Sequence, residues 1–126
     1  MKLTPVLVVE RIELSLSFWV DRMGFEKTVD VPGDNGIAFA ILVRDGVELM
    51  LQTAVGVASD EPAFAPQGES RVASLFIEVD DFADTLERLD GYPLAMAERT
   101  TFYGMREVGV FEPSGHIVVF AARASE

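Results

Sequence analysis

An internal duplication constrains this chain more than any other feature of its sequence. The strand-like run 3–9 is matched half a chain later by the run 72–79, and each leads through acidic residues into a helical pattern. After each helical pattern come three more strand-like runs, which are separated by turn signals. Because a repeated pattern marks a repeated structural unit, both halves are predicted to fold as βαβββ modules.

The helical segments show the periodicity of amphipathic helices. In the first segment Gly24 is a predicted stop, and in the second Asp81 is a predicted N-cap with Gly91 beyond the last turn. The predicted apolar faces comprise Ile12, Leu16, Trp19, Val20 and Met23 in the first helix, and Phe82, Leu86 and Leu89 in the second. Trp19 is expected to pack under the sheet.

The remaining strands are predicted at 25–31, 37–44 and 46–53, and again at 94–100, 103–111 and 116–122. The stretch between the halves carries Gly56, Pro62, Pro66 and Gly68 with scattered Ala, so it is predicted to be a linker, in which Phe64 docks on another part of the molecule. The chain is thus predicted to be a single domain, 1–126, with module one at about 3–54, a linker at about 55–70 and module two at about 71–124.

The charge balance excludes several classes of partner. Ten Lys and Arg against 21 Asp and Glu give a net charge of −11, which disfavours nucleic acids and anionic membranes. The chain has no Cys, and its first apolar run is too short for a signal peptide or a membrane span. We therefore expect a cytoplasmic protein that binds neither nucleic acid nor membrane.

In order along the chain, the motifs resemble the glyoxalase / bleomycin resistance / extradiol dioxygenase (vicinal oxygen chelate) superfamily. They are Pro5-Val6-Leu7, FWVDRMGF at 18–25, the strand pair 39–51, and the segments 103–107 and 112–116. The second motif and the acidic composition are most similar to the bleomycin resistance (bleomycin-binding) proteins. The resemblance implies an α+β fold in which two tandem βαβββ modules form a curved mixed sheet around a cleft, with helices on the outer face. It also implies a homodimer, in which relatives exchange a Pro-containing first strand.

Enzymes of this superfamily usually hold a divalent metal through His, Gln or Glu side chains on the first and fourth strands of each module. Laid on this chain, that pattern falls on Thr4, Met50, Ser74 and Val119. Two hydroxyls, a thioether and an isopropyl group cannot hold such an ion. We therefore expect neither a metal nor another cofactor, and a binding protein is favoured over an enzyme.

Strand alternation predicts which side chains face the cleft. Met50 shares a face with Glu48 and Gln52, and Ser74 shares one with Phe76 and Glu78, whereas Val47, Leu49 and Leu51 lie under the helix. The resemblance adds Phe39, Phe102 and Tyr103 at the border of the cleft. The predicted ligand-binding residues are Phe39, Glu48, Met50, Gln52, Phe76, Glu78, Phe102 and Tyr103. Aromatic rings beside carboxylates suit a cationic or aromatic small molecule.

Each of these residues also has a purely structural interpretation. Glu48 and Glu78 can equally be solvated carboxylates on an open sheet, and Phe39 and Phe76 can be core residues. His116, the one histidine, is expected at the surface at the start of a strand rather than as a general base. Arg106 and Glu107 are expected to form a structural or interface ion pair rather than an acid/base couple.

Two hypotheses of function follow. The first is a metal-free binding protein that sequesters a cationic or aromatic, antibiotic-like compound in a dimer cleft. The alternative is an enzyme of the superfamily, a lyase or dioxygenase, with a displaced metal site or with acid/base chemistry through Glu48 or Glu107. A third interpretation is an interaction or sensor module whose cleft is vestigial.

Overall fold

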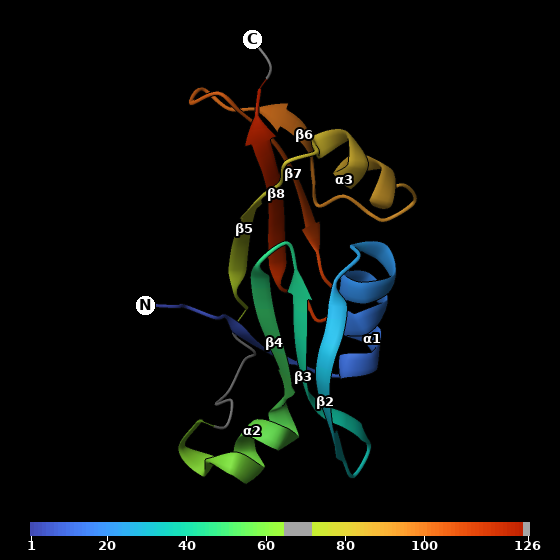
Figure 1. Cartoon of the computed structure of the whole chain (residues 1–126), viewed down its shortest axis with the longest axis vertical. Helices are drawn as coiled ribbons and strands as arrows, with labels where there is room; N and C mark the ends of the chain where they lie inside the picture. Colours follow the sequence, from blue (N-terminus) through green and yellow to red (C-terminus); the bar gives the residue numbers. More distant parts are fainter. Residues whose placement is uncertain (65–71, 125–126) are drawn as a thin grey trace. The chain divides into compact units, whose positions relative to one another are not determined.

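Two four-stranded mixed sheets with three α-helices make up the part of the chain that the computed structural model describes, residues 1–64 and 72–124 (Figure 1). The sheets belong to two separate units, unit 1 within 1–71 and unit 2 within 72–126. The predicted α+β class with two tandem βαβββ modules is confirmed.

Unit 1 contains the first βαβββ module and an additional helix. Its elements are β1 (Val6–Val9), α1 (Ile12–Leu16) with a π-helical continuation η1 (Ser17–Arg22), β2 (Glu26–Gly33), β3 (Gly36–Arg44), β4 (Val47–Thr53), α2 (Ala54–Asp60) and the 3₁₀ turn η2 (Pro62–Phe64). The strand order is β1-β4-β3-β2, with β1 parallel to β4 and the other neighbours antiparallel.

Unit 2 repeats this topology. It consists of β5 (Ser74–Glu78), α3 (Phe82–Arg88), β6 (Met96–Thr100), β7 (Met105–Phe111) and β8 (Ile117–Arg123). Its strand order is β5-β8-β7-β6, again with the first strand parallel to the last. The predicted N-cap of α3 is confirmed, because the Asp81 carboxylate accepts a hydrogen bond of 2.9 Å from the Asp84 N–H.

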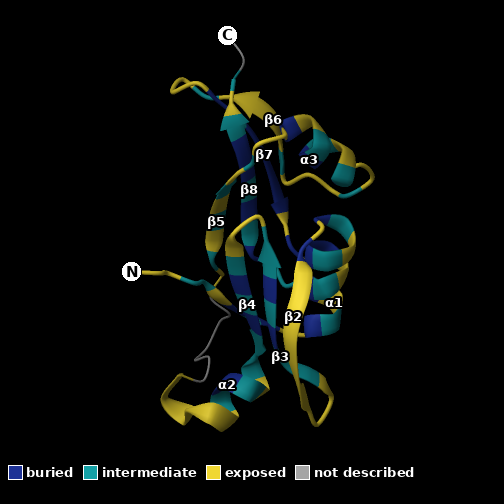
Figure 2. Ribbon diagram, viewed as in Figure 1, coloured by how far each residue is buried: buried dark blue, intermediate teal, exposed yellow. Residues whose placement is uncertain are grey.

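The core of unit 1 lies between α1–η1 and one face of its sheet, where the strands β3 and β4 carry buried side chains (Figure 2). Trp19 is fully buried there, as predicted, and packs edge-on against Phe18 at 5.0 Å and Phe25 at 5.2 Å between ring centroids. Leu49 and Leu51 are buried on the same face, as the alternation predicted.

The first helix was predicted to be α-helical throughout, but its second part, η1, is a π-helix with more residues per turn. The Met23 N–H donates to the Phe18 carbonyl at 2.9 Å, which is the five-residue spacing of a π-helix. The extra residue in this turn turns both Phe18 and Trp19 toward the core, whereas Leu16 and Val20, predicted on the buried face, are only half-buried. The prediction missed Phe18 because it assumed α-helical spacing throughout.

Three local predictions are wrong. Val47 is 43% exposed rather than covered by the helix, because it lies at the β3–β4 turn, opposite Arg44. Helix α2 occupies the first part of the predicted linker, and the prediction for 65–70 lies outside the described residues. Phe64, expected to dock, is 74% exposed.

The prediction that His116 lies at the surface is also wrong, since this residue is only 3% exposed. Its Nδ1 accepts a hydrogen bond of 2.9 Å from the Ala73 N–H, and the Ile117 N–H donates to the Ala73 carbonyl at the same distance. Parallel pairing of β5 with β8 brings the residues before these strands together, so His116 supports the start of β5.

None of the helices within the described ranges has the length and apolar character needed to cross a bilayer.

Candidate functional site

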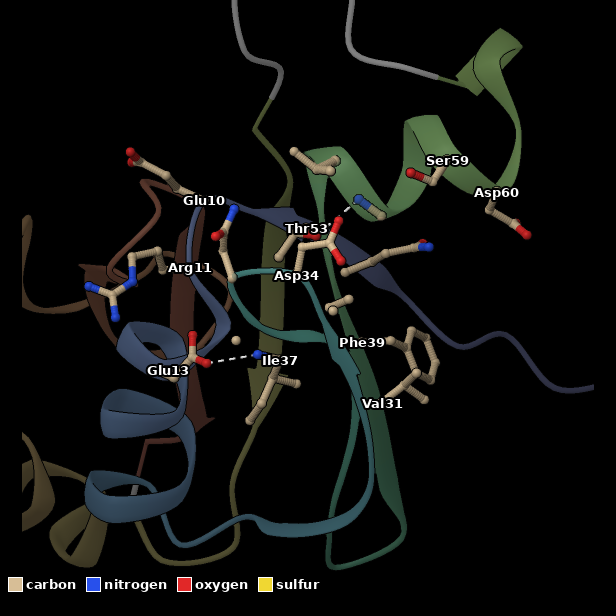
Figure 3. Close-up of a pocket in the computed structure, with 17 residues that line it drawn as sticks. Glu10, Arg11, Glu13, Val31, Asp34, Ile37, Phe39, Thr53, Ser59 and Asp60 are labelled. Carbon is tan, nitrogen blue, oxygen red and sulfur yellow. Dashed lines mark hydrogen bonds between the residues drawn. The ribbon is translucent and has the colours of Figure 1, made fainter.

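Unit 1 contains a cavity of about 760 Å³ at one end of its sheet. Three segments form its wall: the start of α1, the β2–β3 hairpin, and the end of β4 with helix α2 (Figure 3). The hairpin brings its tip back toward the first turn of α1, and α2 follows β4 directly. All the lining residues lie between positions 10 and 60, so unit 1 forms this cavity by itself.

Apolar side chains make up much of the wall. Val31 and Ile37 come from the two strands of the hairpin, and Val55 comes from α2. Phe39 and Gln52, two of the predicted ligand-binding residues, are register partners on β3 and β4 and both line the cavity. Period-two alternation places them on the sheet face opposite the buried core, as it does Met50.

Carboxylates outnumber cations around the cavity. Glu10, Glu13, Asp34 and Asp60 line it, and Arg11 is the one basic residue among the lining side chains that the structure describes. A cavity with apolar walls and a surplus of negative charge attracts a positively charged, partly apolar molecule.

Glu13 joins the helix to the hairpin. Its Oε2 accepts a hydrogen bond of 2.8 Å from the Ile37 N–H (Figure 3). This hydrogen bond lowers the pKa of the Glu13 carboxyl below its ordinary value of 4.5, because it favours the ionised form. Gly36 adopts a φ of +111°, and a Cβ at this position would overlap the Glu13 carboxylate. The close approach of hairpin and helix therefore requires glycine here.

The side chain of Thr53 caps the N-terminus of helix α2. The Thr53 Oγ1 accepts a hydrogen bond of 3.0 Å from the Gly56 N–H. Sequence reasoning missed this helix and its contribution to the cavity, because Gly56 within it and the Pro and Gly residues beyond it suggested a linker. The available sequence signal for the start of this helix was Thr53, a residue type favoured at N-caps, followed by Ala54 and Val55.

The other predicted residues of unit 1 lie farther along the same sheet face. Glu48 and Met50 are half-buried on β4 and do not line the cavity. The Glu48 carboxylate pairs with the Lys2 ammonium at 3.1 Å. Sequence reasoning also did not select Glu10, Glu13 or Asp34 for the site, since only the fold brings the start of α1 beside the hairpin.

Unit 2 carries the remaining four predicted residues. Phe76 and Glu78 are exposed on β5, on the face opposite Leu75 and Ile77. Phe102 is fully exposed and Tyr103 is 51% exposed, and their rings meet edge to face at 5.1 Å. Tyr103 was expected at the start of a strand but lies in the turn before β7.

Glu107 is a buried carboxylate of unit 2 that has two side-chain partners. Its side chain is 2% exposed; Oε2 accepts from the Tyr103 hydroxyl at 2.7 Å and Oε1 from the Arg99 Nη2 at 3.1 Å. Arg106, on the opposite face of β7, pairs with Glu98 at 2.9 Å. The predicted Arg106–Glu107 pair is wrong, because adjacent residues of a strand point to opposite faces and each finds a partner on β6.

The metal pattern of the superfamily that the sequence resembles does not fit this chain. Of the four residues on which that pattern falls, Met50 lies on β4, Val119 on β8 and Ser74 at the start of β5, whereas Thr4 lies before β1. None of the four side chains offers an imidazole, amide or carboxylate donor. Across residues 1–64 and 72–124, no three His, Cys, Asp or Glu side chains gather in an arrangement that could hold a metal ion.

Comparison with known proteins finds a matching family model and solved structures with a similar fold. The model of the Glyoxalase/Bleomycin resistance protein/Dioxygenase superfamily matches residues 3–120. No curated protein matches the chain.

Solved structures with this fold include TioX from Micromonospora sp. ML1, with 17% identity, a TM-score of 0.76 and coverage of 98% of both chains. TnmS3, an antibiotic binding protein from Streptomyces sp. CB03234, has 20% identity and a TM-score of 0.68 over 96% of this chain and 93% of its own. A lactoylglutathione lyase from Agrobacterium tumefaciens has 16% identity and a TM-score of 0.73 over 97% and 92%. At these identities the likeness concerns the fold.

Proposed function

Because the chain belongs to the Glyoxalase/Bleomycin resistance protein/Dioxygenase superfamily, as its motifs indicated, we propose that it binds a small molecule reversibly in the unit 1 cavity. One observation carries the proposal: aromatic and aliphatic side chains line a cavity that four carboxylates and one guanidinium surround. The ligand is released chemically unchanged.

The proposed ligand is a cationic compound with an aromatic part. The ring of Phe39 offers stacking and cation–π attraction, and Gln52 beside it offers an amide. The ionised Glu13 and its acidic neighbours complement a positive charge. Glu48, Met50, Phe76, Glu78, Phe102 and Tyr103 do not line this cavity and remain proposed as ligand-binding residues of the chain.

The fold of an antibiotic binding protein is among those similar to this chain, which supports sequestration of an antibiotic-like compound. We further propose a homodimer in the cytoplasm, supported by the resemblance to bleomycin resistance proteins and by the absence of Cys from the sequence. Light scattering after size-exclusion chromatography measures the oligomeric state directly.

Titration calorimetry with bleomycin and a panel of planar cations tests the binding function. Phe39→Ala is expected to weaken a bound panel member by about 1–2 kcal/mol, because it removes the ring that lines the cavity. Val29→Ala is the control, since Val29 is an exposed β-branched residue on β2 outside the cavity lining. Failure of the wild-type protein to bind any panel member would overturn the proposal.

The alternative proposal is a lyase or dioxygenase of the same superfamily. The buried Glu107 and the fold shared with a lactoylglutathione lyase favour it. Elemental analysis of protein purified without a histidine tag separates the two proposals. Stoichiometric metal that survives dialysis would support the enzyme and contradict the ligand assignment.

A further inference from the structure

We propose that Glu13 is a positioning residue: its hydrogen bond to Ile37 is a latch that holds the tip of the β2–β3 hairpin, residues 31–38, against α1, and the closed latch prolongs the residence of a ligand in the unit 1 cavity. This inference rests on the proposed binding function, because only a bound ligand has a residence time. It concerns unit 1 alone, since both partners of the latch and the whole cavity wall belong to this unit.

The hairpin tip extends beyond the strand that supports the rest of β3. Register pairs between β3 and β4 run from Arg44 to Phe39, so residues 36–38 extend past the paired stretch of β4. On the other side lies β2, the edge strand of this sheet, and all of its residues are exposed. The pairing of β2 with β3 is also irregular between Val31 and Pro32, at the base of the tip. Exposed backbone and an irregular register are features of segments that open locally, so the tip needs another support.

Glu13 supplies such a support from the first turn of α1. Its Oε2 accepts from the Ile37 N–H at 2.8 Å (Figure 3). The backbone N–H of Glu13 itself and the Arg11 guanidinium act on the same carboxylate, and all three groups favour its ionised form, which is the stronger acceptor. Gly36 leaves the space that this contact needs, because a Cβ there would overlap Oε2. The carboxylate therefore connects the helix to the hairpin through one specific hydrogen bond.

The position of the tip decides how much of the cavity wall surrounds a ligand. Val31, Asp34 and Ile37 of the tip line the cavity, next to Phe39 on the paired part of β3. A tip that moves away from α1 removes two apolar side chains and a carboxylate from around the ligand. Changes within one binding site alter dissociation more than association, so the latch should act on the residence time.

The first experiment measures the latch without a ligand. Amide hydrogen exchange followed by NMR at neutral pH reports the opening of the Ile37 N–H. Glu13→Ala removes its acceptor, so this amide should exchange about 5-fold faster, whereas Glu13→Gln keeps a carbonyl oxygen and should restore most of the protection. Glu26→Ala is the matched control, because it removes an exposed carboxylate of β2 outside the cavity lining. Unchanged exchange of the Ile37 amide in Glu13→Ala would overturn the latch.

The second experiment follows the release of proflavine, a planar aromatic cation, by stopped-flow fluorescence. Gly36→Ala keeps the charge of Glu13 but displaces its carboxylate, so proflavine should dissociate about 5-fold faster. Glu13→Gln removes the charge but keeps an acceptor, so association should slow and dissociation should stay closer to the wild-type rate than in Glu13→Ala. Gly46→Ala is the control for a methyl group at a left-handed glycine, since the space around Gly46 is open.

The two latch positions should also be coupled. In Glu13→Ala the acceptor is already absent, so the addition of Gly36→Ala should raise the dissociation rate by much less than about 5-fold. Effects that multiply in the double variant would show that the glycine acts independently of Glu13 and would contradict the latch.

The outcomes separate this inference from the binding function. If the Ile37 amide exchanges faster in Glu13→Ala but proflavine leaves this variant and Gly36→Ala at the wild-type rate, control of residence is wrong and the binding function stands. If proflavine does not bind the wild-type protein, the binding of planar cations and the control of their residence both fail, whereas amide exchange still decides whether Glu13 holds the tip.

Discussion

At the scale of single residues, the hydrogen-bond partners of a glutamate decide its role. Glu13 accepts from the Ile37 N–H, Glu48 pairs with Lys2, and Glu107 holds Arg99 and Tyr103. The buried Glu112 accepts from the Ser114 N–H at 2.5 Å and supports the β7–β8 turn. The surplus of acids in the composition is therefore partly structural, and the fold determines which of them face the cavity.

Glu13 makes the stability of unit 1 depend on pH. The lowered pKa of its carboxyl means that its stabilising contribution is present above the ordinary value of 4.5 and is lost as the pH falls below it. Glu13→Gln should therefore reduce the free energy of unfolding near neutral pH by about 0.5 kcal/mol after solvent screening. Urea unfolding at about pH 7 and about pH 3 measures the difference, which should shrink in acid. A difference that is equal at both pH values would contradict this role.

Gly36 combines a left-handed backbone with a close approach to Glu13. Gly36→Ala should lower the free energy of unfolding by about 1–3 kcal/mol, since the new methyl group displaces the Glu13 carboxylate. Gly46→Ala is the control, because Gly46 has a φ of +80° but open space around it. Thermal unfolding of both variants separates the two effects: equal losses would show that backbone strain alone matters at Gly36.

At the scale of elements, local spacing and capping explain both the correct and the missed predictions. Asp81 and Gly24 act through neighbouring backbone groups, so the helix signals near them could be recognised from the sequence. The π-helical turn of η1 places Phe18 and Trp19 together in the core, which α-helical periodicity could not anticipate. Helix α2 is too short for propensity to reveal, because short helices depend on capping and tertiary packing.

The cap of α2 should matter for ligand binding as well as for stability. Thr53→Ala removes the acceptor of the Gly56 N–H, so we expect a loss of about 1 kcal/mol and faster amide exchange in α2. The affinity of a ligand in the unit 1 cavity should fall as well, since α2 forms part of its wall. Asp81→Ala removes the equivalent cap of α3 in unit 2 and should leave that cavity affinity unchanged. An equal loss of affinity in both variants would refute the local effect.

At the scale of the whole molecule, the net charge of −11 should steer cations toward the acidic cavity. Binding of a planar monocation should weaken several-fold when the salt rises from about 0.05 M to about 0.5 M, because the screening length falls. Calorimetry at both ionic strengths measures the change, with a neutral analogue of the same shape as the control. Affinity that does not depend on salt would show that apolar contact alone holds the ligand.

The sequence by itself determined the duplicated βαβββ topology and the alternating faces of the strands. These features depend on periodicity and residue chemistry, which are local. Only the tertiary structure decided that Glu13 meets the β2–β3 hairpin, that His116 is buried against the segment before β5, and that Arg99 and Tyr103 are the partners of Glu107. Such contacts join residues that lie on different segments of the chain, so the packing of those segments selects them and the periodicity of the sequence does not.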